Sequence, residues 1–138
     1  MQTKQYTLAL PSYTRGMHHI TDKIENLFDS TIQIGIAHIF LQHTSASLCL
    51  SENVDPEVRE DVESFLSDLI PEDYPKFTHT YEGSDDMPAH LKNIIIGSSL
   101  TIPISHGRLA LGTWQGVYLY EHRNHGGNRN IVITLQGT

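Results

Sequence analysis

Short segments in which apolar residues alternate with polar ones fill the last third of the chain. Leu100, Ile102 and Ile104 alternate with polar or small residues, and further strand-like segments follow at residues 117–121 and 131–135. A period of two places successive side chains on opposite faces of a strand. The pair His106-Gly107 predicts a turn between two of these strands. The chain therefore has to build a β-sheet from its carboxyl-terminal part.

Three helices are expected, and each has a stripe of apolar residues at helical spacing. The stripes are Ile20, Ile24, Leu27 and Phe28 in the first helix, Val58, Val62, Phe65, Leu66 and Leu69 in the second, and Met87, Leu91, Ile94 and Ile95 in the third. The second helix begins at Asp55 and Pro56, because Asp accepts an orphan amide bond and Pro suits the first helical position. The third helix ends at Gly97. We expect the first and third stripes to be buried.

The order of these elements sets the fold class. A first strand is expected at residues 4–10, and two more are expected between residues 32 and 50, separated near residues 43–47. Helices come early and in the middle, whereas most strands lie at the end. This order favours a mixed, largely antiparallel sheet over a repeated βαβ pattern. The length of 138 residues predicts a single α+β domain over residues 1–138.

Composition narrows the chemistry. Cys49 is the only cysteine, which excludes an internal disulfide and a thiolate zinc cluster within one chain. Any metal must therefore be held by Asp, Glu or His, and nine histidines are many for this length. The net charge of −7 argues against binding to nucleic acid or anionic membranes. A signal-peptide pattern and a membrane-spanning apolar run are both missing, so we expect a cytoplasmic protein.

His43 is the first candidate for a functional side chain. Strand alternation gives it the same facing as Ile39 and Leu41, so it is expected to point inward. One interpretation is a core imidazole that bonds to a neighbouring hydroxyl or carbonyl. The other is a ligand or base beside the hydroxyls and amides of Thr44 and Ser45, which can receive an anion.

Residues 79–90 form the densest polar stretch of the chain. Its titratable side chains are His79, Glu82, Asp85, Asp86 and His90. Asp86 and His90 are four residues apart, so on a helix they share a face and the carboxylate can orient the imidazole. The alternative is that Asp85 or Asp86 only caps the third helix. The spacing matches no His-Glu-x-x-His zinc motif.

A third polar group follows the strand at residues 117–120. Glu121, His122 and Arg123 come at its end, where a rigid strand can hold side chains over a pocket. Arg123 and Arg129 can clamp a phosphate or a carboxylate through the forked guanidinium. The alternative for each arginine is a solvated surface side chain.

Several long strings resemble those of one known family. They are residues 43–47 (HTSAS), 53–56 (NVDP), 82–90 (EGSDDMPAH), 99–104 (SLTIPI), 107–116, which end in LGTWQG, and 121–123 (EHR). In this order they resemble the YjbQ-like family over essentially the whole chain. The resemblance implies a small α+β subunit that assembles as a homotrimer, with sheets packed about a threefold axis and ligand sites near subunit boundaries.

The resemblance also implies an activity, that of a secondary thiamine-phosphate synthase. Such a transferase joins hydroxymethylpyrimidine diphosphate to thiazole phosphate, so the expected partner is a small phosphorylated metabolite. The expected metal ligands are the imidazoles of His43, His79, His90 and His122. Catalytic roles are expected for Glu82, Asp85, Asp86 and Glu121. Ligand-binding roles are expected for Thr44, Ser45, Asn53, Arg123 and Arg129.

The nature of the metal and of the reaction stays open at this point. An imidazole site suits zinc better than magnesium, which prefers oxygen ligands, although magnesium would serve the transferase reaction. A zinc-dependent hydrolase is therefore one alternative. The other is a trimer without catalytic turnover that binds a small anionic metabolite.

Overall fold

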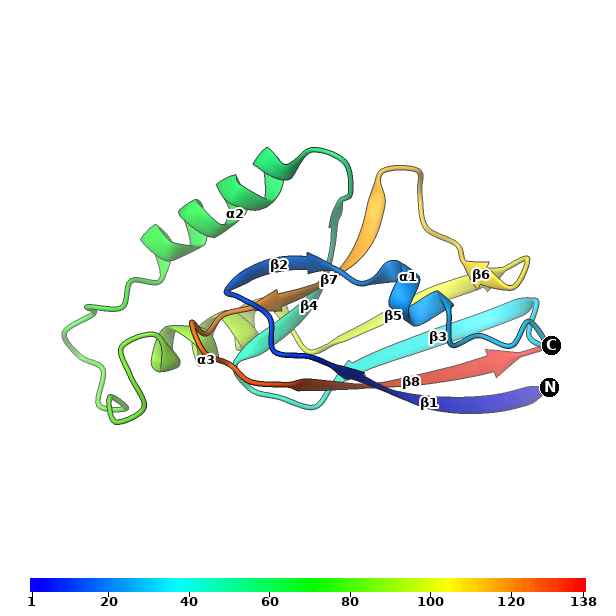
Figure 1. Ribbon diagram of the computed structural model, residues 1–138, viewed down its shortest axis with the longest axis horizontal. Coiled ribbons are helices and arrows are strands. Elements are labelled where there is room, and N and C mark those ends of the chain that lie inside the picture. Colours follow the sequence, from blue (N-terminus) through cyan, green and yellow to red (C-terminus); the bar gives the residue numbers. More distant parts are fainter.

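The computed structural model describes residues 1–138 and contains eight strands and three helices (Figure 1). The strands are β1 (Gln2–Leu10), β2 (Gly16–His19), β3 (Ile34–Leu41), β4 (Ala46–Glu52), β5 (Ser99–Ser105), β6 (Arg108–Leu109), β7 (Gln115–Glu121) and β8 (Arg129–Gly137). The helices are α1 (Thr21–Glu25), α2 (Pro56–Leu69) and α3 (Asp86–Ile96). The predicted α+β class with three helices is confirmed.

The strands form two antiparallel sheets. The larger sheet has the order β1-β8-β3-β5-β6, and the smaller one has the order β2-β7-β4. Every pair of neighbouring strands is antiparallel. The prediction of antiparallel pairing is therefore confirmed, but the strands divide between two sheets. Strand β2 was not predicted, because four residues are too short to show a clear alternation.

The main core lies between the two sheets. The inward side chains of β3, β5 and β8 meet those of β4 and β7, and the short helix α1 closes one end of this layer (Figure 1). Ile39 and Ile133 of the larger sheet and Leu119 of the smaller one are fully buried. Ile20 and Ile24 of the predicted first stripe are also fully buried, but the helix ends at Glu25. Period-two alternation thus selects the buried face of β3, β5 and β8, whereas β7 is buried on both faces.

Helix α2 covers the other face of the smaller sheet (Figure 1). Met17, Tyr118 and Tyr120 form a second apolar cluster there, against Val62 and Leu66 of α2. The helix begins as predicted, because the Asp55 side chain accepts a hydrogen bond of 2.9 Å from the backbone N–H of Glu57. No helix of the chain is long and apolar enough to span a membrane.

Helix α3 contradicts the predicted burial of its apolar stripe. Ile94 and Ile95 are 74% and 64% exposed. The buried positions are instead Asp86, Ala89 and Lys92, together with Pro88. The prediction was wrong because it assumed that the apolar side of an amphipathic helix faces its own subunit. In this chain the polar side of α3 faces the rest of the subunit.

A tight turn joins β5 to β6 as predicted. His106 and Gly107 have positive φ angles of 53° and 76°. Two successive residues with positive φ are typical of a type I′ hairpin turn, whose twist matches that of the flanking strands. The pairing of Ser105 with Arg108 follows directly from this turn.

Candidate metal centre

The polar face of α3 is fixed to the loop between β3 and β4. Asp86, His90 and Asn93 lie at i, i+4 and i+7, so they share one face of the helix. The side-chain amide of Asn93 donates to the backbone oxygen of Ala46 at 2.7 Å. His90 Nδ1 donates to the backbone oxygen of Thr44 at 2.8 Å. These bonds hold the polar face of α3 against the start of β4, where Ala46 is fully buried and its carbonyl needs a donor.

Asp86 is the centre of this polar face. Its side chain is 2% exposed, and its Oδ2 atom lies 2.6 Å from His79 Nε2 and 3.1 Å from His90 Nε2. One nitrogen from each imidazole and one carboxylate oxygen lie within 4.8 Å of one another. His79 comes from the long loop between α2 and α3, so folding brings it to the helix. The predicted contact of Asp86 with His90 is therefore confirmed, and the structure adds His79 to it.

Arg123 joins the same group from the end of β7. Its Nη1 atom lies 2.8 Å from Asp86 Oδ1, and its Nε donates to Asp85 Oδ2 at 3.1 Å. A third bond runs from Nη2 to the backbone oxygen of Glu82 at 2.7 Å. Asp85 also accepts the backbone N–H of Asn124 at 2.8 Å. The guanidinium therefore bridges both carboxylates and is not free to clamp a ligand.

These contacts keep both carboxylates ionised. Burial by itself raises the pKa of Asp86, but the hydrogen bond from His79 and the charges of His90 and Arg123 together hold it below its usual value. Burial also raises the pKa of Asp85. The bonds from Asn124 and Arg123 outweigh this effect and lower the pKa below its usual value. Burial opposes the charge on Arg123, yet the bond to Asp85 raises the pKa of this guanidinium.

The donor set fits a divalent metal. Because His90 Nδ1 donates to a backbone carbonyl, Nε2 is the ring nitrogen left for a metal; it faces Asp86, to which it donates when no metal is bound. Two imidazoles and one carboxylate form the ligand set of many catalytic zinc sites, which leave a fourth position open. Ligands about 2.1 Å from a tetrahedral ion are roughly 3.4 Å apart, so the closer His79 has to move outward slightly. Its side chain is 42% exposed and can do so.

A cavity of about 330 Å³ adjoins this group. It lies under the loop between α2 and α3, and its walls include His79, Tyr74, Phe77 and Met87. The rings of Tyr74 and Phe77 are 4.9 Å apart and tilted against each other. Most of the remaining lining is polar and includes the carboxylates of Glu72 and Asp73, so the cavity is a polar pocket with one aromatic wall.

Glu121 and Arg129 form a separate buried pair. Glu121 is fully buried and accepts bonds of 2.7 Å and 2.6 Å from Arg129. Arg129 also donates to Ser45 Oγ at 2.9 Å. Gly126 covers the pair closely, since an added Cβ would lie 2.3 Å from the carboxylate. The predicted roles of Glu121 in catalysis and of Ser45 and Arg129 in ligand binding are not supported, because these groups bind one another.

His122 and His43 do not join the metal group either. His122 is buried, and its Nε2 atom lies 2.8 Å from Ser47 Oγ. Burial first, and then the charge of Lys92, lower the pKa of His122 to about 3. His43 follows the end of β3 and accepts the backbone N–H of Asn130 at 2.9 Å. Of the four expected imidazole ligands, His79 and His90 contact Asp86. His43 and His122 instead bond to Asn130 and Ser47.

The remaining predicted residues contribute backbone groups or stabilise a turn. Glu82 and Thr44 have exposed side chains and offer only their backbone oxygens, to Arg123 and His90. The side-chain amide of Asn53 donates to the backbone oxygens of Thr113 and Gln115, and these bonds hold the turn before β7. The side chain of Asn53 forms no hydrogen bond to His79, Asp86 or His90.

Two buried polar residues near the site were not predicted. Lys92 is 1% exposed on α3, and Ser47 is fully buried on β4. Burial and then the charge of Arg15 lower the pKa of Lys92. A sequence signal for Lys92 existed, because Asp86, His90 and Asn93 already mark a polar stripe next to it. The stripe was missed because the apolar side of α3 was assumed to face the core.

The chain is similar to several proteins of one family. Residues 6–138 match the family described as "UPF0047 protein YjbQ-like". The chain is 52% identical over 135 residues to "UPF0047 protein YjbQ" of Escherichia coli O157:H7, covering 96% of this chain and 97% of that one. It is 40% identical over 134 residues to a UPF0047 protein of Synechocystis sp., covering 96% and 91%. A conserved hypothetical protein of Thermus thermophilus has a matching solved structure, with a TM-score of 0.85, 32% identity and coverage of 95% and 99%.

Proposed function

The chain belongs to the UPF0047 YjbQ-like family, and we propose that it is a metal-dependent transferase of the thiamine-phosphate synthase type. The observation that carries this proposal is the buried carboxylate of Asp86 between the imidazoles of His79 and His90. The substrates proposed are hydroxymethylpyrimidine diphosphate and thiazole phosphate. In the reaction a C–O bond to the diphosphate breaks as the thiazole nitrogen forms a C–N bond to the same methylene carbon. Pyrophosphate leaves with the electron pair, and no proton has to be removed from the ring nitrogen.

A divalent ion bound there, with zinc favoured by the imidazoles, would supply positive charge to the departing diphosphate. His79, Asp86 and His90 hold that ion. Arg123 keeps Asp86 ionised and fixes its orientation through the 2.8 Å contact. The aromatic wall of Tyr74 and Phe77 in the adjoining cavity suits stacking against a flat heterocycle.

A zinc-dependent hydrolase is a second candidate for the same residues. It is favoured by one observation, since Arg123 and Arg129 are both engaged by carboxylates and neither is free to bind a diphosphate. Hydrolysis of a less highly charged ester requires fewer cations. In that case the exposed carboxylate of Glu82 is the candidate base for an attacking water, since His79 is then a metal ligand.

One assay separates these candidates. The purified protein is incubated with hydroxymethylpyrimidine diphosphate, with or without thiazole phosphate, in the presence of zinc, manganese or magnesium. Thiamine phosphate and pyrophosphate are both measured. A transferase releases pyrophosphate only when thiazole phosphate is present, whereas a hydrolase releases phosphate products without it. Absence of both products with every metal would contradict the transferase. If a less highly charged ester such as p-nitrophenyl acetate is not cleaved either, the hydrolase is contradicted as well and a metabolite-binding role is left.

Variants tie the activity to the site. Asp86→Asn is expected to lower the rate at least 100-fold, because the metal loses a ligand. His106→Asn is the matched control, since His106 is an exposed imidazole in the β5–β6 turn and Asn tolerates its positive φ. An Asp86→Asn variant that keeps full activity would refute this assignment of the site.

A cytoplasmic homotrimer is the proposed assembly. Large apolar side chains are exposed on several elements, and groups of this kind are typical of subunit contacts. Ile94 and Ile95 form one patch on α3, and Ile34, Ile36 and Phe40 form the other on β3. Light scattering on a size-exclusion column is expected to give three times the mass of one chain. Ile95→Glu and Ile36→Glu identify which face is involved, and a monomeric wild type would refute the proposal.

A further inference from the structure

Arg59 differs from every other arginine of the chain. The other four form ion pairs: Arg15 with Glu63 and Glu72, Arg108 with Glu25, Arg123 with Asp85 and Asp86, and Arg129 with Glu121. Arg59 forms none, and its Nε atom is buried without a hydrogen-bond partner. A buried donor without a partner costs about 1–3 kcal/mol, so native proteins rarely leave one unpaired. The unpaired guanidinium therefore requires an explanation.

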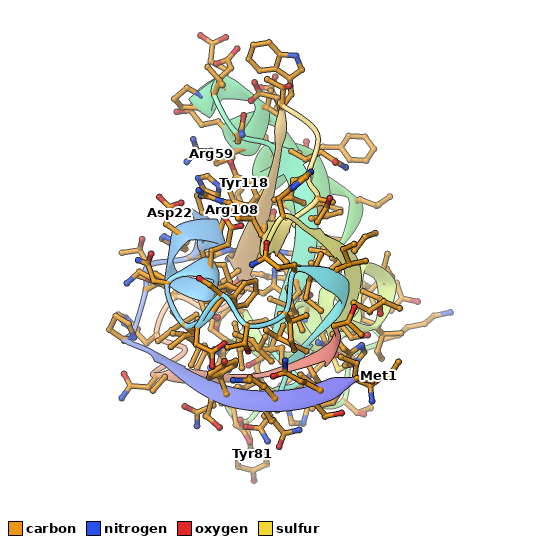
Figure 2. The ribbon with its side chains drawn as sticks, turned by 90° about the vertical axis from the view of Figure 1, so that its right-hand side faces the viewer. Met1, Asp22, Arg59, Tyr81, Arg108 and Tyr118 are labelled. Atoms are coloured by element: carbon orange, nitrogen blue, oxygen red, sulfur yellow. The ribbon has the colours of Figure 1, made fainter.

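The position of Arg59 is well defined by its neighbours. Its guanidinium lies over the ring of Tyr118, 5.5 Å from the ring centroid, and Figure 2 shows the two side chains together. Tyr118 is fully buried, and its hydroxyl donates to the backbone oxygen of Glu52 at 2.8 Å. The ring of His19 stacks on Tyr118 at 5.1 Å. Because the ring beneath it cannot move, Arg59 is held in place before any ligand arrives.

A cavity opens beside this guanidinium. It has a volume of about 450 Å³ and lies between β2 and the amino-terminal half of α2. Gly16 and Met17 line one side, and Pro56, Arg59 and Ser64 line the other. None of its lining residues belongs to the His79, Asp86 and His90 group or to the cavity next to it. The space is large enough for a small metabolite.

The charges around the cavity limit the ligand to one anionic group. Arg15 also lines it, but its guanidinium is occupied by Glu63 at 2.8 Å. Glu63 is further engaged by the hydroxyl of Tyr120. Glu60 is exposed at the rim and has no cationic partner. Arg59 is thus the single free cation, and Glu60 repels an anion with two charges.

We propose that Arg59 anchors a small monocarboxylate in this cavity, at a site separate from the metal centre. The planar edge of a guanidinium formed by its two terminal nitrogens matches the two oxygens of a carboxylate. Such a ligand neutralises the unpaired charge, while the buried Nε stays on the protein side of the guanidinium. Phosphate carries more charge at neutral pH and is disfavoured by Glu60.

The test uses the full chain and propanoate as the probe. Arginine Nε–H signals are followed by NMR while propanoate is added, with acetate and phosphate in parallel titrations. A saturable shift of the Arg59 signal is expected with propanoate, and phosphate is expected to bind at least fivefold more weakly. Arg59→Gln is expected to abolish binding, and Arg59→Lys to weaken it about tenfold, because lysine lacks the fork.

Two controls make the result decisive. Arg108→Gln removes an exposed arginine elsewhere and is expected to leave propanoate binding unchanged. His90→Ala is expected to leave it unchanged as well, which separates this site from the metal centre. The proposal is overturned if no saturable shift occurs, if Arg59→Gln and Arg59→Lys bind as the wild type does, or if both variants change the oligomeric mass. The last result would mean that Arg59 pairs with a neighbouring subunit.

Discussion

Replacing Asp86 by Asn tests the metal centre most directly. The carboxylate is almost fully buried and accepts three contacts, from His79, His90 and Arg123, at 2.6, 3.1 and 2.8 Å. Asn keeps the size of the side chain but removes the negative charge. Its amide group also presents a donor where only acceptors fit. The substitution therefore alters both the stability of the fold and the affinity for metal.

The two effects have different sizes. A hydrogen bond to a charged group contributes about 1.5–3 kcal/mol. His79 is partly exposed and regains water, and Arg123 keeps its bond to Asp85, so only part of this energy is lost. We expect the free energy of unfolding without metal to fall by about 2–3 kcal/mol. Loss of an outer partner already weakens metal sites by about 10–100-fold, so loss of a ligand should lower zinc affinity at least 100-fold.

Two measurements and one matched variant check these values. Zinc affinity is measured by competition with a chromophoric chelator, and stability by urea unfolding with and without zinc. Zinc is expected to stabilise the wild type against urea but not Asp86→Asn. Asp85→Asn removes a neighbouring carboxylate that contacts Arg123 but neither imidazole, so its zinc affinity should stay within about threefold of the wild type. Equal zinc affinity of Asp86→Asn and wild type would refute the reasoning.

Three further substitutions test other parts of the structure. Asp55→Ala removes the cap of α2 and should lower the free energy of unfolding by about 1 kcal/mol in urea, with Glu60→Ala as a control outside the cap. Gly126→Ala places a Cβ against the buried Glu121 carboxylate and should destabilise by about 1–3 kcal/mol; an unchanged urea midpoint would contradict this crowding. His122 has a pKa of about 3 in the fold and 6.5 as the ordinary value, so the unfolded chain takes up its proton first. Stability from this group is complete above pH 6.5 and is lost as the pH falls toward 3, with a slope of up to about 1.4 kcal/mol per pH unit. His122→Gln should flatten the fall measured between pH 6.5 and 5, and equal slopes would disprove the assignment.

Most elements of the fold were predictable because their signals are local. Asp55 and Pro56 start α2 as expected, and His106 and Gly107 form the expected turn. Residues 100–104 alternate in burial as the sequence alternates in polarity. Each of these features depends on hydrogen bonds and steric limits within a few residues. The division into two sheets was not predictable in this way, since it depends on which strands meet after folding.

The orientation of α3 shows where the pattern misled. An apolar stripe identifies the face of a helix that avoids water, but it does not say what covers that face. Ile94 and Ile95 point outward, whereas Asp86 and Lys92 point inward. The polar face is selected because the carbonyls of Thr44 and Ala46 need donors, which His90 and Asn93 provide. Those carbonyls are more than 40 residues away in sequence.

The sequence predicted that the candidate site consists of histidines and carboxylates, but it identified only some of the residues that meet there. The spacing of Asp86 and His90 gave a shared helical face, and the structure confirms their contact. His122 and Glu121 were expected to join them but bond to Ser47 and Arg129 instead. Position at the end of a strand suggested function for these two residues, although it equally suits a buried structural bond.

The sequence by itself determined the secondary structure of most segments, the lack of cysteine ligands and the face that Asp86 and His90 share. Only the tertiary structure decided that His79 completes this group, that Glu121 neutralises Arg129 and that Arg59 stays unpaired. The physical reason is the distance along the chain over which each kind of interaction acts. Local preferences act over about four residues along the chain, whereas these pairings depend on how separate loops and strands pack, and no spacing in the sequence records those distances.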